Sequence, residues 1–164
     1  MNRPRLSFLT LVAGVSLACL TGCGKKAAPP NTGAIPAHHE HHPPHSGTPV
    51  VLGNEAYHLE LVLDSASGTL QVYILDGEME NFVRCADPTL EFDVMEGGRS
   101  KTLTLSAVAN PATGETVGDT ALFEAHADWL KTAKDFDGTL KKIAIRGTIF
   151  TDVQFNFPKG NDRD

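Results

Sequence analysis

Short runs in which apolar and polar residues alternate fill the chain from about residue 49 onward, and they constrain its fold more than any other feature. In AYHLELVLD (residues 56–64), tyrosine and leucine side chains share one face of an extended strand, while His58 and Glu60 lie on the other. TLQVYILD (69–76) repeats the alternation, with Leu70, Val72 and Ile74 inward. The SASG between the two runs indicates a hairpin. Further strands are predicted at residues 90–95, 101–108, 121–126, 141–147 and 151–157.

Glycine-rich and polar segments separate these strands and predict turns at residues 97–98 and 110–119. One short helix is expected within residues 126–134, with Trp129 and Leu130 facing the sheets. The pattern predicts an all-β, mainly antiparallel fold. We expect a small immunoglobulin-like β-sandwich with one short helix, and a partly open β-barrel is the alternative. A domain of about 110 residues can support such a core without disulfide bonds.

The N-terminus is expected to be a secretory leader spanning residues 1–22. Arg3 and Arg5 precede an apolar stretch that runs from Leu6 to Leu20 and is too short to span a membrane comfortably. The stretch ends at LTGC, and this tetrad resembles the lipobox of bacterial lipoproteins, in which cleavage leaves an acylated cysteine at the new N-terminus. The resemblance implies lipidation of Cys23, palmitate included, and anchoring of the mature protein in a membrane. An ordinary signal peptide with a chance cysteine is the alternative.

The resemblance to lipoproteins also implies a location. Gly24 stands where an aspartate would favour the inner membrane, so the outer membrane is favoured, with the protein facing the periplasm. Loss of the leader removes two arginines and no acids, which lowers the net charge from −6 to −8 with neutral histidines. This acidity disfavours nucleic acid as a partner. Of three cysteines, only Cys85 remains unmodified, and its apolar neighbours predict a small buried core residue instead of a reactive thiol.

Residues 23–48 form a segment of different composition. The segment is rich in proline and histidine and has almost no aliphatic side chains, so it cannot bury enough surface to offset ordering. We therefore expect a lipidated cysteine plus a disordered tether over 23–48, a β domain over 49–160 and a short tail over 161–164.

The tether contains a histidine tract, AHHEHHPPHSG, that suits metal binding. Neutral imidazoles bind Zn(II), Cu(II), Ni(II) and Co(II), and several from one flexible segment can reach one ion. Ordering the segment opposes binding, so modest affinity and loose selectivity are expected, with release as imidazoles protonate near pH ~6.5. The alternative is a solvated spacer without a metal.

A second candidate is a structured metal site where the tether meets the domain. His58 and Glu60 lie two apart on one strand, so they project from the same face and point to solvent unless that face is covered. Combined with His45 they would form a site with partly pre-positioned ligands. The alternative is that the pair is ordinary strand surface. The candidate metal ligands are therefore His38, His39, His41, His42, His45, His58 and Glu60.

Catalytic motifs are not found in the sequence. DFDGTL at residues 135–140 matches the D-x-D-G-T-L string of haloacid-dehalogenase-type phosphatases, but the preceding residues do not form an apolar strand. We interpret the segment as a turn that terminates a helix. The sequence has no G-x-S-x-G, phosphate-binding glycine loop or C-x-x-C, so we do not expect an enzyme.

Residues 44–82 resemble a small envelope domain of bacterial heavy-metal efflux loci, which occurs there as a His-headed lipoprotein and as an extension of periplasmic efflux adaptor subunits. The matching positions are Pro44-His45, Gly47, Leu52-Gly53, Tyr57-His58, Glu60-Leu61-Val62, Asp64, Gly68 and Val72-Tyr73-Ile74-Leu75-Asp76. Two positions depart from the family: Ser46 replaces a glycine, and Glu78 stands where many members have a histidine. The resemblance implies metal handling and a periplasmic cation-efflux system as partner, and no defined reaction.

The sequence thus predicts a non-enzymatic envelope lipoprotein that binds or buffers a divalent transition metal in connection with efflux or resistance. A structural or protein-interaction lipoprotein with a histidine-rich spacer is the alternative. The strand face that carries His58 and Glu60 discriminates between the two, because an open face near His45 favours metal binding and a covered face favours the interaction role.

Overall fold

The computed structural model describes residues 42–161, which contain eight strands and one 3-10 turn. The predicted leader, the predicted lipidation site Cys23 and three candidate ligands (His38, His39 and His41) lie outside the described residues. The strands are β1 (Thr48–Leu52), β2 (Tyr57–Asp64), β3 (Thr69–Asp76), β4 (Thr89–Glu96), β5 (Arg99–Ala107), β6 (Leu122–His126), β7 (Phe136–Ile145) and β8 (Thr148–Phe157), and the 3-10 turn η1 is Asp128–Lys131. No helix between residues 42 and 161 has the length and apolar character needed to cross a membrane.

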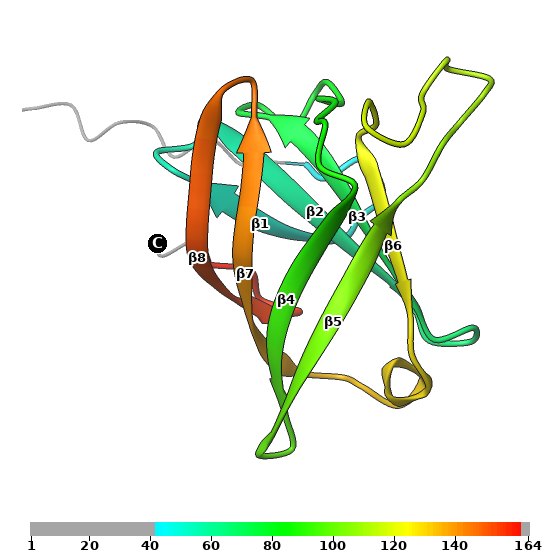
Figure 1. The fold of residues 1–164 in the computed structure, drawn as a ribbon. Coiled ribbons are helices and arrows are strands. Elements are labelled where there is room, and N and C mark those ends of the chain that lie inside the picture. Colours follow the sequence, from blue (N-terminus) through cyan, green and yellow to red (C-terminus); the bar gives the residue numbers. More distant parts are fainter. Residues whose placement is uncertain (1–41, 162–164) are drawn as a thin grey trace, which may run out of the picture. The chain divides into compact units, whose positions relative to one another are not determined.

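All eight strands belong to one antiparallel sheet with the order β1-β2-β3-β6-β5-β4-β7-β8, which curves into a nearly closed barrel (Figure 1). The all-β prediction is confirmed. The single sheet corresponds to the partly open barrel, which was the alternative, whereas a sandwich needs two separate sheets. Strand β6 is the physical reason, because it pairs with β3 on one side and with β5 on the other.

The barrel interior is filled by the apolar face of each alternating strand. Most of the inward positions predicted on β2 and β3 are buried in the core, as the alternation requires, namely Leu59, Leu61, Leu70, Val72 and Ile74. Tyr57 and Leu63, at the two ends of the predicted inward face of β2, are partly buried against it. Three phenylalanines from other strands, Phe92, Phe123 and Phe136, are the largest fully buried side chains.

The seam between β1 and β8 is closed by side chains. The amide of Asn161 accepts a hydrogen bond from the Val51 N–H (2.7 Å) and donates one to the Val51 carbonyl (3.1 Å), as a strand residue would. Further along the seam, the Phe150 ring on β8 packs edge-on against Tyr57 of β2, with centroids 6.0 Å apart. Asn161, assigned above to the tail, therefore contributes to the barrel.

Two local predictions were wrong. The segment around residues 135–140 is not a turn after a helix, because Phe136 begins β7, which pairs antiparallel with β4 and β8. Gly138 enables this path: a Cβ on it would lie 2.3 Å from Cζ of Phe155, so the glycine leaves space for that ring. The helix predicted within residues 126–134 is only the four-residue η1, which buries Leu130.

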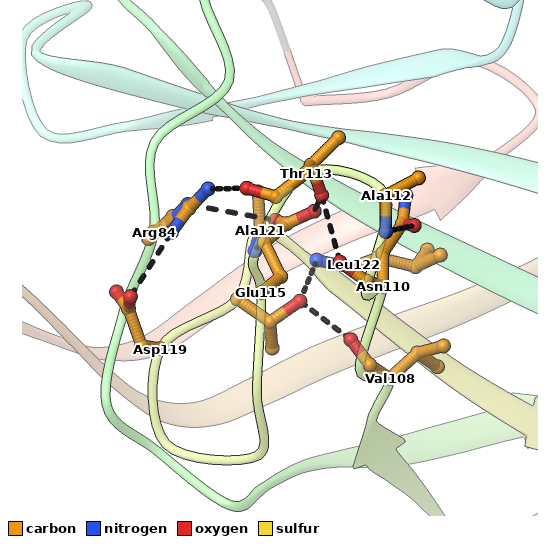
Figure 2. A network of polar contacts seen from close by, with 10 residues as sticks. Arg84, Val108, Asn110, Ala112, Thr113, Glu115, Asp119, Ala121 and Leu122 are labelled. Atoms are coloured by element: carbon orange, nitrogen blue, oxygen red, sulfur yellow. Dashed lines mark hydrogen bonds and ion pairs between the residues drawn. The ribbon is translucent and has the colours of Figure 1, made fainter.

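The loop between β5 and β6 is fixed by polar contacts around Arg84, as Figure 2 shows. The guanidinium donates to Asp119 (3.1 Å) and to the Thr113 carbonyl (2.6 Å). Glu115 accepts a hydrogen bond from the Ala121 N–H at 2.9 Å. Burial opposes ionisation of Glu115, but hydrogen bonds from the Thr113 hydroxyl and the Ala121 N–H, together with the nearby Arg84 charge, lower the pKa of its carboxyl group. The turns predicted over residues 110–119 are therefore held in a defined conformation.

Substitution of Asn161 tests the closure of the seam. We expect Asn161→Ala to lower the free energy of unfolding by about 1–3 kcal/mol, because it removes both hydrogen bonds to Val51. Urea unfolding followed by Trp129 fluorescence measures the change. Asn54→Ala, in the exposed turn after β1, is the control and should stay within about 0.5 kcal/mol of wild type. Equal stability of Asn161→Ala and wild type would contradict the role of the amide.

Candidate functional site

The chain enters the barrel through a tight turn at residues 43–46. The Ser46 N–H donates to the Pro43 carbonyl (3.0 Å), and Pro44 supplies the fixed φ that the second turn position favours. Ser46 then adopts a left-handed backbone conformation, with φ of 56°. The hydrogen-bonded part of the chain therefore begins before residue 49 and includes the last residues of the predicted tether.

The carboxylate of Glu60, on the outer face of β2, holds this turn in place. Its Oε1 accepts the backbone N–H groups of His45 (2.7 Å) and Gly47 (2.9 Å). Its Oε2 lies 2.8 Å from Nδ1 of the His45 ring. The Glu60 side chain is fully buried. A buried carboxylate is stable only when it is well hydrogen-bonded, and these three donors meet that need.

Gly47 is required for this close approach. A Cβ at this position would lie 2.6 Å from the Leu61 carbonyl oxygen and 2.7 Å from Cγ of Glu60. Any other residue would push the turn away from β2 and lengthen its hydrogen bonds to Glu60.

The His45 imidazole is held between the carboxylate and two aromatic rings. It stacks on Tyr73 with ring centroids 4.1 Å apart and an interplanar angle of 17°. The centroid of the Phe82 ring lies 5.9 Å from that of the imidazole. Tyr73 is the cross-strand neighbour of Glu60 on β3. Burial, and then the negative charge of Glu60, raise the pKa of the Tyr73 phenol. The rings thus orient an imidazole that remains 37% exposed.

The bond to Glu60 selects the tautomer of His45. A neutral imidazole that faces a carboxylate through Nδ1 carries its proton there, so we assign Nε2 as the nitrogen with the lone pair. Within residues 42–161, Glu60 is the one hydrogen-bond partner of the ring. Metal-binding histidines typically donate their second N–H to a carboxylate in this way.

His58 does not share the environment of His45. It is fully buried, and its Nδ1 lies 3.3 Å from the Asp76 carbonyl. The face of β2 that carries His58 and Glu60 is therefore covered and not open to solvent. The structure brings His45 and Glu60 together as expected, but it gives Glu60 the position of an anchor beneath His45.

The described residues alone do not make a complete metal site. Between residues 42 and 161 no three or more His, Cys, Asp or Glu side chains are grouped so that they could hold a metal ion. His45 presents one nitrogen, and the exposed His42 precedes it by three residues. The other histidines of the tract, at positions 38, 39 and 41, lie outside the described residues.

Sequence reasoning missed the aromatic support of His45. Tyr73 could have been found, because the predicted hairpin between β2 and β3 places it opposite Glu60. Phe82 could not, since it reaches the site through a loop whose path the sequence pattern does not indicate.

A groove with a volume of about 910 Å³ lies elsewhere, lined by residues of β4, β7 and β8. Its lining includes Asp93, Asp137, Asp152, Gln154 and Asn156, and no histidine or cysteine. The Asp93 carboxylate accepts a hydrogen bond from the Thr102 hydroxyl and forms an ion pair with Lys141. We therefore place the candidate site at His45, where an exposed nitrogen donor is oriented by buried groups.

Cys85 is a buried core residue, as predicted. Burial raises the pKa of its thiol to about 11, so the sulfur is neutral at physiological pH. A neutral buried thiol is a poor nucleophile and a poor metal ligand.

No family model matches the chain, and comparisons with curated proteins and with solved structures find no significant match.

Substitution of Gly47 tests the packing of the turn on β2. Gly47→Ala should lower the free energy of unfolding by about 1–3 kcal/mol, because the added methyl group overlaps the Leu61 carbonyl and Glu60. Ser46→Gly is the matched control in the same turn. It relieves a left-handed conformation and adds freedom to the unfolded chain, so its net effect should be below about 1 kcal/mol. Urea denaturation compares the two, and equal effects of both variants would show that the contact with β2 is unimportant.

Proposed function

We propose that this protein is a non-enzymatic, membrane-anchored envelope lipoprotein that binds or buffers divalent transition metal ions in connection with metal efflux or resistance. The single observation that carries the proposal is the exposed His45 imidazole, whose Nδ1 lies 2.8 Å from the buried Glu60 carboxylate. Such a pair gives a histidine a defined tautomer and a fixed ring orientation. The histidine tract leads directly into this residue.

Nitrogen donors define the class of metal. Imidazoles suit Zn(II), Cu(II), Ni(II) and Co(II), whereas Mg(II) and Ca(II) require oxygen ligands. Most of the proposed ligands come from the tether, so ordering it opposes binding and keeps the affinity modest. A modest affinity fits a role in capturing metal and passing it to periplasmic components of a cation-efflux system.

Calorimetric titration of the full chain in detergent with Zn(II), Cu(II), Ni(II) and Co(II) tests the metal function. We expect binding that weakens by about tenfold or more when His38, His39, His41 and His42 are all replaced by alanine, because only His45 then remains of the tract. His126→Ala, which removes an exposed histidine from β6, is the control and should leave binding unchanged. Absence of binding in the unaltered chain would exclude the metal function.

The proposed anchor depends on Cys23. We expect a labelled fatty acid to be incorporated into the protein in cells and to be lost in Cys23→Ser, because only the thiol of the lipobox cysteine accepts the acylated group. Fractionation of the envelope then tests the favoured outer-membrane location. Labelling that persists in the variant would contradict this site of attachment.

One observation favours the alternative, a structural or protein-interaction lipoprotein. The face of β2 that carries His58 and Glu60 is covered, and Phe82 beside it is an exposed large apolar side chain. Such a side chain can contact a partner. In that case the tract is only a spacer, and the calorimetric experiment gives no binding.

A further inference from the structure

We infer that Nε2 of His45 anchors the metal to the folded domain, and that Glu60 is the residue that positions it and not a ligand. This inference rests on the proposed metal function and deepens it. Two modes of metal binding differ in how they depend on folding. Histidines of a tether alone bind metal whether or not the domain is folded, whereas a ligand held by β2 binds best when the domain is folded.

Glu60 cannot coordinate a metal without loss of the turn. Both carboxylate oxygens are engaged by donors from residues 45–47, at 2.7–2.9 Å. The side chain is fully buried beneath that turn. Turning the carboxylate toward a metal would leave two backbone N–H groups in a partly buried region without an acceptor, which is unfavourable.

His45 is constrained in every direction except through Nε2. Its backbone N–H is bound to Oε1 of Glu60 and its Nδ1 to Oε2. Its ring stacks on the ring of Tyr73, with centroids 4.1 Å apart. Because the ring is already ordered, this ligand loses little rotamer freedom when a metal binds.

The buried negative charge strengthens the ligand. A divalent metal on Nε2 withdraws electron density from the imidazole and makes its Nδ1–H a stronger donor to Glu60. The hydrogen bond and the metal bond therefore reinforce each other.

His42 is the candidate second ligand that lies closest to His45 in the sequence. It is exposed and lies immediately before Pro43 and Pro44, the turn that positions His45.

This arrangement has a thermodynamic signature. A metal that binds the folded and unfolded chains equally does not change the melting temperature, whereas a metal that prefers the folded chain raises it. A tenfold preference for the folded chain raises the Tm of a domain of this size by about 5 °C.

The test is the shift in Tm of the full chain, in detergent, on addition of Zn(II) or Ni(II), measured by Trp129 fluorescence. His45→Asn is the key variant, because the Asn amide can occupy the position of Nδ1–H and donate to Glu60 while lacking Nε2. We expect the metal-dependent shift in Tm to disappear in His45→Asn.

In Glu60→Gln the His45 ligand is kept but the carboxylate that orients it is lost, and we expect metal affinity about 10–100-fold weaker. Glu91→Gln, an exposed charge-matched change on β4, should behave as wild type.

The tautomer of His45 provides a readout that does not depend on metal or on the stability of the variants. Nitrogen NMR of the metal-free wild type should show the proton on Nδ1 and the lone pair on Nε2. The opposite tautomer would overturn the inference.

The outcomes separate this inference from the proposed function. Metal binding by calorimetry without a Tm shift, or with a shift that persists in His45→Asn, overturns the role of His45 and leaves a metal-binding tether. No binding of any metal to the unaltered chain overturns both. A shift that His45→Asn abolishes and Glu91→Gln retains supports the inference.

Discussion

Burial of the Glu60 carboxylate is the constraint on which the N-terminal edge of the barrel depends. An ionised carboxylate removed from water must find hydrogen-bond donors, or folding becomes unfavourable by several kcal/mol. Here the donors are two backbone N–H groups and one imidazole, all from residues 45–47. The same charge thus places the turn, orients His45 and makes Gly47 necessary.

The position of that turn also explains how the barrel begins and ends. Once residues 45–47 are fixed on β2, β1 follows immediately beside β2. The outer edge of β1 then faces the end of the chain, where Asn161 supplies the hydrogen-bonding groups of a strand. A side-chain amide is suited to this seam, because it satisfies both backbone groups of Val51 without continuing the sheet.

The proposed metal function joins two parts with different physical properties. In this proposal, the histidine-rich tether supplies many weak ligands, and the domain supplies one ligand with a defined tautomer and orientation. A ligand held by a folded domain adds selectivity for geometry that a tether lacks. The core takes no part in this chemistry, since its thiol at Cys85 is buried and neutral.

The sequence alone determined the all-β class, the positions of most strands and the inward face of β2 and β3, because strand alternation reports directly which side chains avoid water. It also offered a site that combined His45, His58 and Glu60, of which the structure brings His45 and Glu60 together and buries His58 apart from them. It did not determine the barrel, since the choice between one sheet and two depends on β6 pairing with both β3 and β5, a long-range contact that local pattern does not encode. For the same reason β7 was misread, because the space that Gly138 leaves is filled by Phe155 from another strand. The role of Glu60 was likewise decided by tertiary structure. A polar residue on an alternating strand is assumed to face solvent, and only the folded chain shows that residues 45–47 cover it and satisfy its charge.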